Sequence, residues 1–403
     1  MSDFLWQTYH RLIAETEIPA HRFLYDQLDL DHRLTGIIGP RGVGKTTLLL
    51  QLIKEKFYPD HPVFYFSADN AYFNEVSILE FVNQLYLTQH IHLFFIDEIH
   101  KYPRWNQELK NIYDSFPKVK ILFSGSSSIN LIEGVYDLSR RARLLYLPGL
   151  SFREYLNIKT DNQFPAIVFE DLIERHSHWA AKLSKIATIS QHFEEYLLFG
   201  YYPIVFQSRE NLYSAIANII DKTIYEDIAN FFNLKTNNLN LFKRIINFLA
   251  SILPGKIKTN NLAQHLSIDN KTAEHYLDIL RRTGLIKILH PVAHGNQLLT
   301  KPAKIYLDNT TLLAAVNTFL SEKLNVGTER ELAFFQFLSG TNLHAFYPKH
   351  GDFQINDILF EIGGKNKTGK QLISHDGKKI LVKDRILVGS KNEIPLYLFG
   401  FLY

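Results

Sequence analysis

Between residues 33 and 148, short and mostly apolar runs alternate with segments whose apolar residues recur at helical spacing. Such runs are typical of strands buried on both faces of a sheet, and strands that alternate with helices favour a parallel sheet covered by helices. The pattern predicts strands at 34–38, 63–67, 93–96, 119–123 and 144–147, and helices at 45–56, 77–87 and 104–116. It therefore predicts an α/β domain over residues 1–148, with an amphipathic helix in the first 32 residues packed on the sheet.

The pattern changes after this domain. Residues 150–235 are helical in periodicity and rich in aromatic side chains, and a polar stretch at 236–240 marks a second boundary. A final mixed segment starts near residue 325, and it contains strand candidates at 353–362, 380–388 and 395–402.

Between these segments lies a helix–turn–helix pattern. A helix is predicted over 260–266 and a second over 270–283, where Gly284 ends it, and the strand-like residues 285–289 would begin a wing. Helix–turn–helix modules place the start of their second helix against DNA bases. Packing or protein contact is the alternative use of such a module.

A glycine-rich stretch joins the first predicted strand to the first helix. It reads Gly39-Pro40-Arg41-Gly42-Val43-Gly44-Lys45-Thr46, and it fits G-x-x-x-x-G-K-[ST], the P-loop of nucleoside-triphosphate-binding proteins. Such a turn directs backbone N–H groups and a helix N-terminus at phosphate oxygens. Lys45 can then reach the β- and γ-phosphates, Thr46 can ligate Mg²⁺ through its hydroxyl, and Thr47 extends the same site. The motif predicts that the chain binds a nucleotide.

An acidic pair, Asp97 and Glu98, ends the third predicted strand about 50 residues after the P-loop. The carboxyl ends of parallel strands line the crevice where ligands bind in such sheets. We expect Asp97 to hold the Mg²⁺ shell and Glu98 to polarise the attacking water as a general base. A helix N-cap is the structural alternative, and the spacing from the P-loop favours the catalytic interpretation.

Two further side chains are candidates for this site. The serine-rich stretch 124–128 offers Ser126 to contact the γ-phosphate or to orient water, although an ordinary turn has the same composition. Arg141, one of three arginines within residues 139–143, could supply a transition-state cation in cis or to a neighbouring subunit. A solvated basic strand edge is the alternative for these arginines.

Composition narrows the class of protein. The 403 residues include 44 Lys and Arg against 41 Asp and Glu, a formal net charge of +3. A balance of this kind neither requires nor excludes nucleic acid, so any basic surface must be local. The absence of cysteine excludes disulfides, thiolate metal sites and cysteine nucleophiles. Without a signal-peptide pattern or an apolar run of roughly 18 residues, the sequence predicts a cytoplasmic protein with no membrane partner.

Several strings resemble a large family of bacterial and archaeal predicted AAA+ ATPases with a restriction-endonuclease-like C-terminal domain. The strings are GPRGVGKTTLL (39–49), FFIDEIHKYPRWNQELKNIYD (94–114), LFSGSSS (122–128), LPGLSFREYL (147–156), FGYYP (199–203) and KIYLDN (304–309). DEIHKYPRW is the most specific of them. The family's characteristic arginine before the LSF motif falls on Arg141, and Arg140 stands where a glycine is usual.

This resemblance implies a fold class as well as cofactors. We expect an α/β protein made of a P-loop AAA+-type parallel sheet with a helical lid, a winged helix and a small α/β restriction-endonuclease-like C-terminal domain. The implied cofactors are ATP and Mg²⁺. The expected domains are the ATPase core over 1–148, the lid over 149–236, the winged helix over 237–292 and the nuclease-like domain over 293–403.

The nuclease-like end departs from the pattern that cleavage requires. A PD-(D/E)xK site needs two carboxylates to hold Mg²⁺ and a lysine two residues after the second acid. Asp352 and Glu361 fit the acids, but Gly363 stands in place of the lysine and Lys365 lies two residues further on. Lys365 lies too far along the strand for the alternation of side chains to place it beside the two acids. We therefore expect a degenerate domain whose lysine-rich stretch could still hold a phosphate backbone.

Five residues of the helix–turn–helix are candidates for DNA contact. Lys271, Thr272 and His275 lie at or near the start of its second helix, and Arg281 and Arg282 near its end could grip phosphates.

These observations favour a Mg²⁺-dependent ATPase whose nucleotide state drives a conformational switch coupled to double-stranded DNA. ATP is favoured over GTP because no guanine-reading N-K-x-D string follows the sheet. Two alternatives stay open: an ATP-gated, Mg²⁺-dependent DNA nuclease, and an ATP-binding transcription or signalling regulator with little turnover. A protein partner or a homo-oligomer is compatible with each of them.

Overall fold

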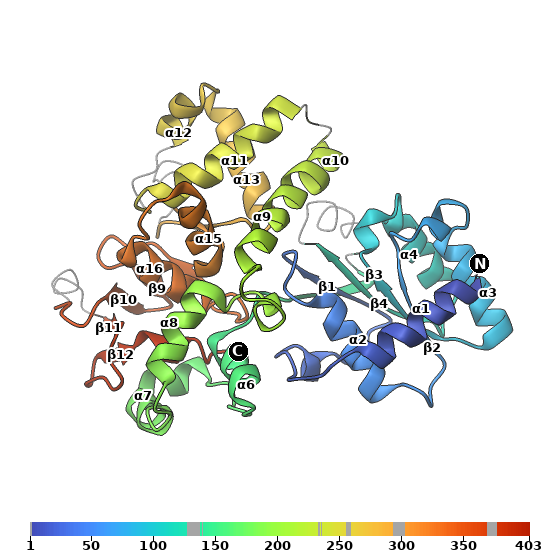
Figure 1. Cartoon of the computed structure of the whole chain (residues 1–403), viewed down its shortest axis with the longest axis horizontal. Helices are drawn as coiled ribbons and strands as arrows, with labels where there is room; N and C mark the ends of the chain where they lie inside the picture. The colour runs from blue at the N-terminus through green and yellow to red at the C-terminus, as the bar shows by residue number, and fades with distance from the viewer. Residues whose placement is uncertain are drawn as a thin grey trace. The chain divides into compact units, whose positions relative to one another are not determined.

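The computed structural model of the chain describes residues 2–126, 138, 140–232, 234, 236–254, 259–292, 303–368 and 377–403. The chain divides into two compact units, Met1–Gly149 and Leu150–Tyr403 (Figure 1). Across the described residues, every helix is too short or too polar to span a bilayer.

The first unit is built on a parallel sheet with the strand order β2-β3-β4-β1-β5. Its strands are β1 (Leu34–Gly39), β2 (Val63–Ser67), β3 (Leu93–Asp97), β4 (Lys120–Ser126) and β5 (Ala142–Tyr146). The structure confirms the five strands that the apolar runs predict. Strands β1, β2, β3 and β4 are buried almost throughout. Strands β2 and β5 are the two edges of the sheet, and of these only β5 is half-exposed.

Helices pack on this sheet as predicted. They are α1 (Ser2–Glu15), α2 (Lys45–Lys56), α3 (Ile78–Gln89) and α4 (Trp105–Ser115), with 3₁₀ turns η1 (Tyr25–Gln27), η2 (Ala71–Asn74) and η3 (Ile99–Lys101). The amphipathic helix α1 packs against α2 and β2, where the rings of Trp6 and Tyr9 lie 4.5 and 5.4 Å from that of Phe64. A capping box between Ser77 and Glu80 begins α3.

The second unit contains a mixed sheet with the order β12-β11-β10-β9-β8. Its strands are β8 (Ala345–Phe346), β9 (Phe353–Ile355), β10 (Ile358–Gly363), β11 (Lys378–Lys383) and β12 (Glu393–Pro395). Strands β8, β9 and β10 pair antiparallel, and β10, β11 and β12 pair parallel.

Two strand predictions in this unit are wrong. The segment 353–362 is not one strand but the hairpin β9–β10, because Asn356 adopts a left-handed conformation (φ 51°) and reverses the chain. The segment 395–402 contains the short helix α17 (Leu396–Phe399) instead of a strand. Periodicity cannot distinguish a buried helix from a buried strand in an apolar run this short.

Helices make up most of the rest of this unit. They are α6 (Phe152–Thr160), α7 (Phe169–Leu183), α8 (Ile189–Phe199), the 3₁₀ turn η4 (Pro203–Phe206), α9 (Leu212–Lys222), the π-helical turn η5 (Thr223–Ile228), α10 (Ala229–Phe232), α11 (Thr236–Ser251), α12 (Thr259–Leu266), α13 (Asn270–Arg282), α15 (Thr310–Leu320) and α16 (Val326–Gln336).

The elements of the predicted helix–turn–helix are present. Helices α12 and α13 match the two predicted segments, Asp269 caps α13, and Gly284 follows that helix with φ 74°. Strand β6 (Ile286–Leu289) pairs antiparallel with β7 (Lys304–Leu307). The segment 293–302 between the two strands lies outside the described residues. That these elements act as a winged helix stays a prediction.

The two ends of the second unit pack together. The Ser151 hydroxyl and the Arg153 guanidinium both donate to the Tyr403 backbone oxygen, at 2.7 and 2.9 Å. The Phe152 ring meets the Phe401 ring edge-on at 5.7 Å. The start of the predicted lid and the end of the predicted nuclease-like domain therefore share a core, and the predicted boundaries inside this unit stay predictions.

Candidate functional site

The P-loop connects β1 to α2 and needs glycine at three positions. Gly42 and Gly44 have φ of 78° and 92°, a conformation that side chains with a Cβ rarely adopt. At Gly39 a Cβ would lie 2.1 Å from the Leu147 carbonyl oxygen. The glycines let the chain turn tightly, so that α2 starts at Lys45 directly after the loop, and the N-terminus of a helix favours an anion.

The Lys45 ammonium lies over this loop. It is buried, and it donates to the carbonyl oxygens of Gly39 at 3.0 Å and Pro40 at 2.9 Å. Phosphate oxygens at the loop would compete with these carbonyls for the same protons. Of the other predicted loop residues, Val43 is buried, Arg41 is half-buried, and Thr47 is exposed.

The Asp97 carboxylate is the centre of a buried polar cluster, and its residue is only 3% exposed. The Thr46 hydroxyl donates to Oδ2 at 2.6 Å, and the Tyr65 hydroxyl donates to the same oxygen at 3.1 Å. The Ser124 hydroxyl and the Glu98 N–H donate to Oδ1, the latter at 3.1 Å. Hydrogen bonds to both oxygens offset the cost of burying a charge.

Tyr65 acts in this cluster only as a donor. Burial, with the negative charge of Asp97 beside it, raises the pKa of the Tyr65 hydroxyl well above its ordinary value. The hydroxyl therefore stays protonated at any physiological pH and keeps its hydrogen bond to the carboxylate.

The donor set at this point fits Mg²⁺. The ion prefers oxygen ligands in an octahedron, and in nucleotide sites it binds one or two protein groups together with phosphate oxygens. The Thr46 hydroxyl and the Asp97 carboxylate supply two such oxygens 2.6 Å apart. Neighbouring ligands of an octahedral Mg²⁺ lie about 3 Å apart, so little movement is needed for both to coordinate one ion.

Glu98 follows Asp97 in a left-handed conformation, with φ 50° and ψ 37°. Its Oε2 lies 3.5 Å from Nε2 of the buried His100 ring. Nδ1 of the same ring accepts a hydrogen bond of 3.3 Å from the Ser126 N–H. Since Nδ1 is an acceptor, the proton of a neutral ring lies on Nε2 and faces Glu98. His100 thus connects the predicted general base to the end of β4.

Ser126 and Ser124 lie two residues apart on β4, and both are buried. The sequence singles out Ser126, whose backbone N–H contacts His100, whereas it is the Ser124 hydroxyl that reaches Asp97. The sequence analysis missed this role of Ser124. Strand register was the missing signal, because Phe123 lies opposite Ile96 and Ser124 is therefore level with Asp97. Tyr65 was missed because it lies in an apolar run.

Arg141 lies at the other end of the sheet. It precedes Ala142, which pairs with Leu34 at the start of β1, while the P-loop follows Gly39 at the end of that strand. Five strand residues separate these ends by about 16 Å, and Asp114 accepts hydrogen bonds of 3.1 and 3.2 Å from the guanidinium. This geometry disfavours a role for Arg141 at the P-loop of its own chain. Action on a neighbouring subunit stays a prediction.

The two acids of the nuclease-like end each lie near a lysine, and their role at a metal stays a prediction. Lys304 Nζ lies 3.6 Å from Asp352 and 3.0 Å from Glu331, and the other Asp352 oxygen accepts the Ile362 N–H. Glu361 is 1% exposed and pairs with Lys367 at 3.0 Å. Within the described part of the chain, no group of three or more metal-type side chains is present. The lysine that reaches Glu361 is Lys367, which the sequence analysis missed, and Lys365 is exposed.

The candidate DNA-contacting residues of α13 have different surroundings. Lys271 and His275 are exposed. The Thr272 hydroxyl and N–H both bond to the capping residue Asp269. Arg281 and Arg282 each lie 2.7 Å from the Asp278 carboxylate, which offsets part of their charge. Their contact with DNA stays a prediction.

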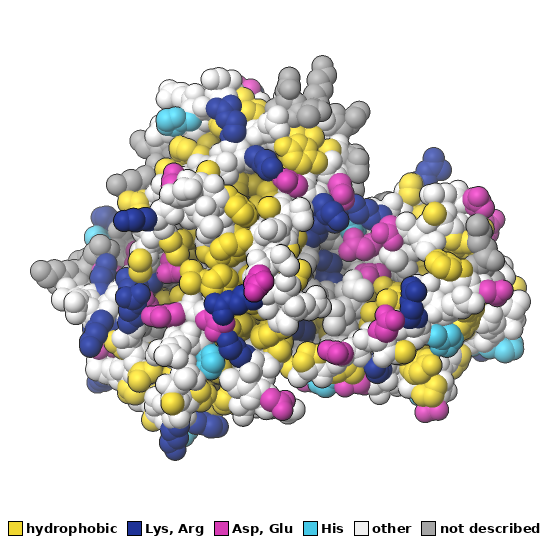
Figure 2. Space-filling model, viewed as in Figure 1, with side chains coloured by type: hydrophobic (Ala, Val, Ile, Leu, Met, Phe, Trp, Pro, Cys, Tyr) yellow, Lys and Arg dark blue, Asp and Glu magenta, His cyan; other side chains and the backbone are white. Residues whose placement is uncertain are grey.

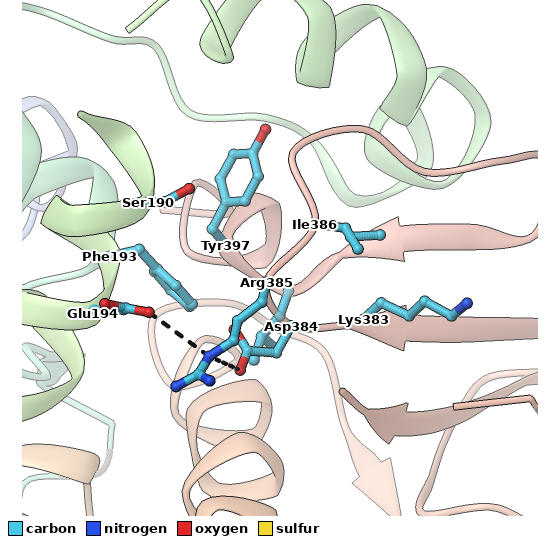
Figure 3. Close-up of a pocket in the computed structure, with 9 residues that line it drawn as sticks. Ser190, Phe193, Glu194, Lys383, Asp384, Arg385, Ile386 and Tyr397 are labelled. Atoms are coloured by element: carbon cyan, nitrogen blue, oxygen red, sulfur yellow. Dashed lines mark ion pairs between the residues drawn. The ribbon is translucent and has the colours of Figure 1, made fainter. Parts of the chain in front are cut away.

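The second unit also contains two hollows that the sequence does not predict. Apolar side chains gather over α9 and α15 (Figure 2), where a groove of about 350 Å³ is lined by Ala217, Ile220, Ile246, Val316, Phe319 and Leu320. A smaller hollow lies between α8 and the segment after β11. There the Arg385 guanidinium lies between the carboxylates of Glu194 and Asp384 (Figure 3).

Comparisons with known proteins agree with the geometry of the first unit. A family model described as an AAA domain matches residues 31–156, and one described as a domain of unknown function matches residues 190–324. No curated protein matches the chain.

Among solved structures, AMPPCP-bound DnaA from Aquifex aeolicus is 15% identical, with 68% of this chain and 86% of that chain covered and a TM-score of 0.28. A DNA replication initiation factor is also 15% identical over the same shares, with a TM-score of 0.25. Scores this low carry no argument about either unit. The family match, the P-loop and the five-stranded parallel sheet together support a P-loop AAA+-type nucleotide-binding domain in the first unit.

Proposed function

We propose that the first unit binds and hydrolyses ATP with Mg²⁺, and that its nucleotide state drives a conformational switch coupled to double-stranded DNA. The observation that carries this proposal is the meeting of Thr46, from the start of α2, with Asp97, from the end of β3, directly beside the P-loop lysine. Segments about 50 residues apart supply these groups. P-loop NTPases hold Mg²⁺ and phosphate with a hydroxyl and a carboxylate in this arrangement.

Each residue has one task in the proposed reaction. The N–H groups at the start of α2 and the Lys45 ammonium bind phosphate oxygens and offset their charge. Thr46 and Asp97 would hold Mg²⁺, which when bound neutralises charge that develops on the phosphates. Tyr65 and Ser124 keep the Asp97 carboxylate in place by hydrogen bonds to both of its oxygens.

Hydrolysis requires a base near the attacking water. Glu98 is the candidate, because it is adjacent to Asp97 at the carboxyl end of the sheet and its carboxylate faces His100. His100 would orient the carboxylate without taking part in proton transfer. Ser126 is a further candidate to contact the γ-phosphate, since it lies opposite Gly39 in the register of β1 and β4.

Coupling to DNA rests on features of the second unit. Lys271 and His275 are exposed at the start of α13, where helix–turn–helix proteins read bases. Lys and Arg side chains also gather around β10 and β11 (Figure 2), and Lys365 and Lys378 are exposed there. Clustered cations of this kind bind phosphate backbones without sequence preference.

The test is phosphate release from ATP and Mg²⁺, with and without double-stranded DNA, by the wild type and two variants. We expect Lys45→Ala to abolish nucleotide binding and turnover, because it removes the charge that faces the phosphates. Glu98→Gln should keep ATP binding and lower turnover by about 100-fold or more. Normal turnover by Glu98→Gln would contradict its role as base. A turnover rate that does not change with DNA would refute the DNA coupling but not the proposed ATPase activity.

A further inference from the structure

Arg22 connects the P-loop to the segment where the chain leaves the first unit. The residue is 7% exposed and precedes η1. Its guanidinium donates to the carbonyl oxygen of Val43 in the P-loop at 2.5 Å. It also donates to the carbonyl oxygens of Pro148 at 2.7 Å and Gly149 at 3.1 Å. One buried side chain thus bridges segments more than 100 residues apart in the sequence.

The guanidinium is well suited to link two segments. It is planar and rigid, and its donors point in fixed directions, so it cannot follow one acceptor without changing its geometry to the others. A buried and charged donor also forms stronger hydrogen bonds than an exposed one. A change in the Val43 carbonyl is therefore expected to move the acceptors at Pro148 and Gly149.

The Val43 carbonyl is linked through its peptide group to a backbone N–H of the P-loop. It belongs to the same planar peptide group as the N–H of Gly44, the residue that precedes Lys45. In a P-loop, backbone N–H groups of this stretch point at phosphate oxygens. Rotation of the peptide toward a phosphate turns its carbonyl as well, and Arg22 holds that carbonyl.

Residues 147–149, here named the exit segment, also lie against the base of the loop. The Leu147 N–H donates to the Ile38 carbonyl oxygen at 2.8 Å. The Leu147 carbonyl oxygen lies so close to Gly39 that a Cβ there would be 2.1 Å away. The exit segment thus contacts both the start of the P-loop and, through Arg22, its end.

The backbone is also hydrogen-bonded directly after the exit segment. Leu150 is the first residue of the second unit. Its N–H donates to the Tyr201 carbonyl oxygen at 2.8 Å, and its own carbonyl oxygen accepts from the Tyr196 hydroxyl at 2.6 Å. The hydrogen bonds of the first unit thus extend to Gly149, and those of the second unit begin at Leu150.

We infer that Arg22 is a positioning residue that couples phosphate binding at the P-loop to the exit segment, and through it to the second unit. The inference rests on the proposed nucleotide site. It assigns the mechanical link of the switch to a residue that lies outside the P-loop and the acidic pair.

The test compares Arg22→Gln with a matched control, Arg33→Gln. The Arg33 guanidinium also donates to three backbone carbonyls of the first unit, those of Tyr113, Phe116 and Val119. Those carbonyls lie around the end of α4 and the start of β4, away from the P-loop. Both substitutions remove a comparable set of hydrogen bonds, and only one touches the proposed link.

Two readouts separate coupling from binding. Affinity for a fluorescent ATP analogue with Mg²⁺ reports the P-loop itself. Energy transfer between dyes on Gln107→Cys in the first unit and Ala181→Cys in the second reports the coupling. Both sites are exposed and the chain has no other cysteine, so only these positions are labelled.

In the wild type and in Arg33→Gln, we expect ATP and Mg²⁺ to change the energy transfer. Arg22→Gln should weaken binding by about tenfold, the loss of one strong hydrogen bond, and should show no change in energy transfer when saturated with nucleotide. An unaltered nucleotide response in saturated Arg22→Gln would overturn the inference, as would a wild type that binds ATP with no response. A wild type that does not bind ATP would instead refute the proposed function.

A folding defect can be recognised separately. Arg22→Lys keeps the charge but has a single nitrogen, which cannot reach all three carbonyls in the same geometry. If Arg22→Gln does not fold, we expect Arg22→Lys to bind ATP and to lose at least half of the energy-transfer response. A full response from Arg22→Lys would equally contradict the proposed link.

Discussion

At the scale of single residues, the candidate site depends on groups that hold Asp97 as much as on the groups that meet the ligand. Asp97 is buried, and it receives hydrogen bonds from Thr46, Tyr65, Ser124 and the Glu98 backbone. A carboxylate in such a position would bind Mg²⁺ in one orientation only, because rotation would break several bonds at once. The residues that orient it are thus expected to affect turnover without touching phosphate.

Variants of the two serines of β4 test whether the residues that orient Asp97 affect turnover. Ser124→Ala removes a hydrogen bond to Asp97, and we expect it to lower kcat about tenfold, the cost of roughly 1.4 kcal/mol. Ser126→Ala is the matched control, a buried hydroxyl two residues along the same strand. We expect it to have the smaller effect in phosphate-release assays, with both variants melting near the wild type. A larger loss in Ser126→Ala would contradict the role of Ser124 and would instead support the proposed contact of Ser126 with the γ-phosphate.

At the scale of elements, α16 carries an acid in an unusual position. Glu329 lies in the first turn of α16, and burial raises its pKa from 4.5 to about 7, with the negative charge of Asp384 as the next cause. Arg330 and Arg385 oppose this effect, and Glu194 adds to it. Arg330 also donates to Asp384 at 2.8 Å. The packing of α16 against the end of β11 is thus sensitive to a proton on one carboxyl group.

This position predicts how stability depends on pH. The folded state binds the Glu329 proton more tightly than the unfolded state, so stability is greatest below pH 4.5 for this group and falls as pH rises to about 7. Above that pH the cost is about 3 kcal/mol. Glu329→Gln should therefore melt higher than the wild type at pH 8 and similarly at pH 4.5. Glu322→Gln, at an exposed position in the segment that joins α15 to α16, is the control. Equal melting of Glu329→Gln and wild type at pH 8 would show that the carboxyl is not buried as described.

At the scale of the whole molecule, the division into two units separates the candidate nucleotide site from the predicted helix–turn–helix. The first unit contains the P-loop and the Asp97 cluster, and the second contains the helix–turn–helix elements and the mixed sheet. In the mixed sheet the acids Asp352 and Glu361 each lie near a lysine, Lys304 and Lys367 respectively. A ligand of the first unit is expected to stabilise that unit and to affect the second only through the connection at 149–150.

Calorimetry can test this separation. We expect the full chain to unfold in two transitions, and ATP with Mg²⁺ at 100 times Kd to stabilise one of them by about 2.7 kcal/mol, a rise of about 5 to 10 °C. The other transition should move much less. Lys45→Ala should abolish the shift and leave both transitions otherwise in place. One transition that moves as a whole would mean that the two units unfold together.

The sequence alone determined the P-loop, the acidic pair and the strands of the first sheet. Each of these depends on neighbouring residues, namely a glycine pattern, an apolar run and the charges that end it. The tertiary structure decided which distant groups meet: Arg22 with the exit segment, Tyr65 and Ser124 with Asp97, and Lys367 with Glu361. Strand order and register bring these residues together, and residue periodicity along the chain does not contain that information.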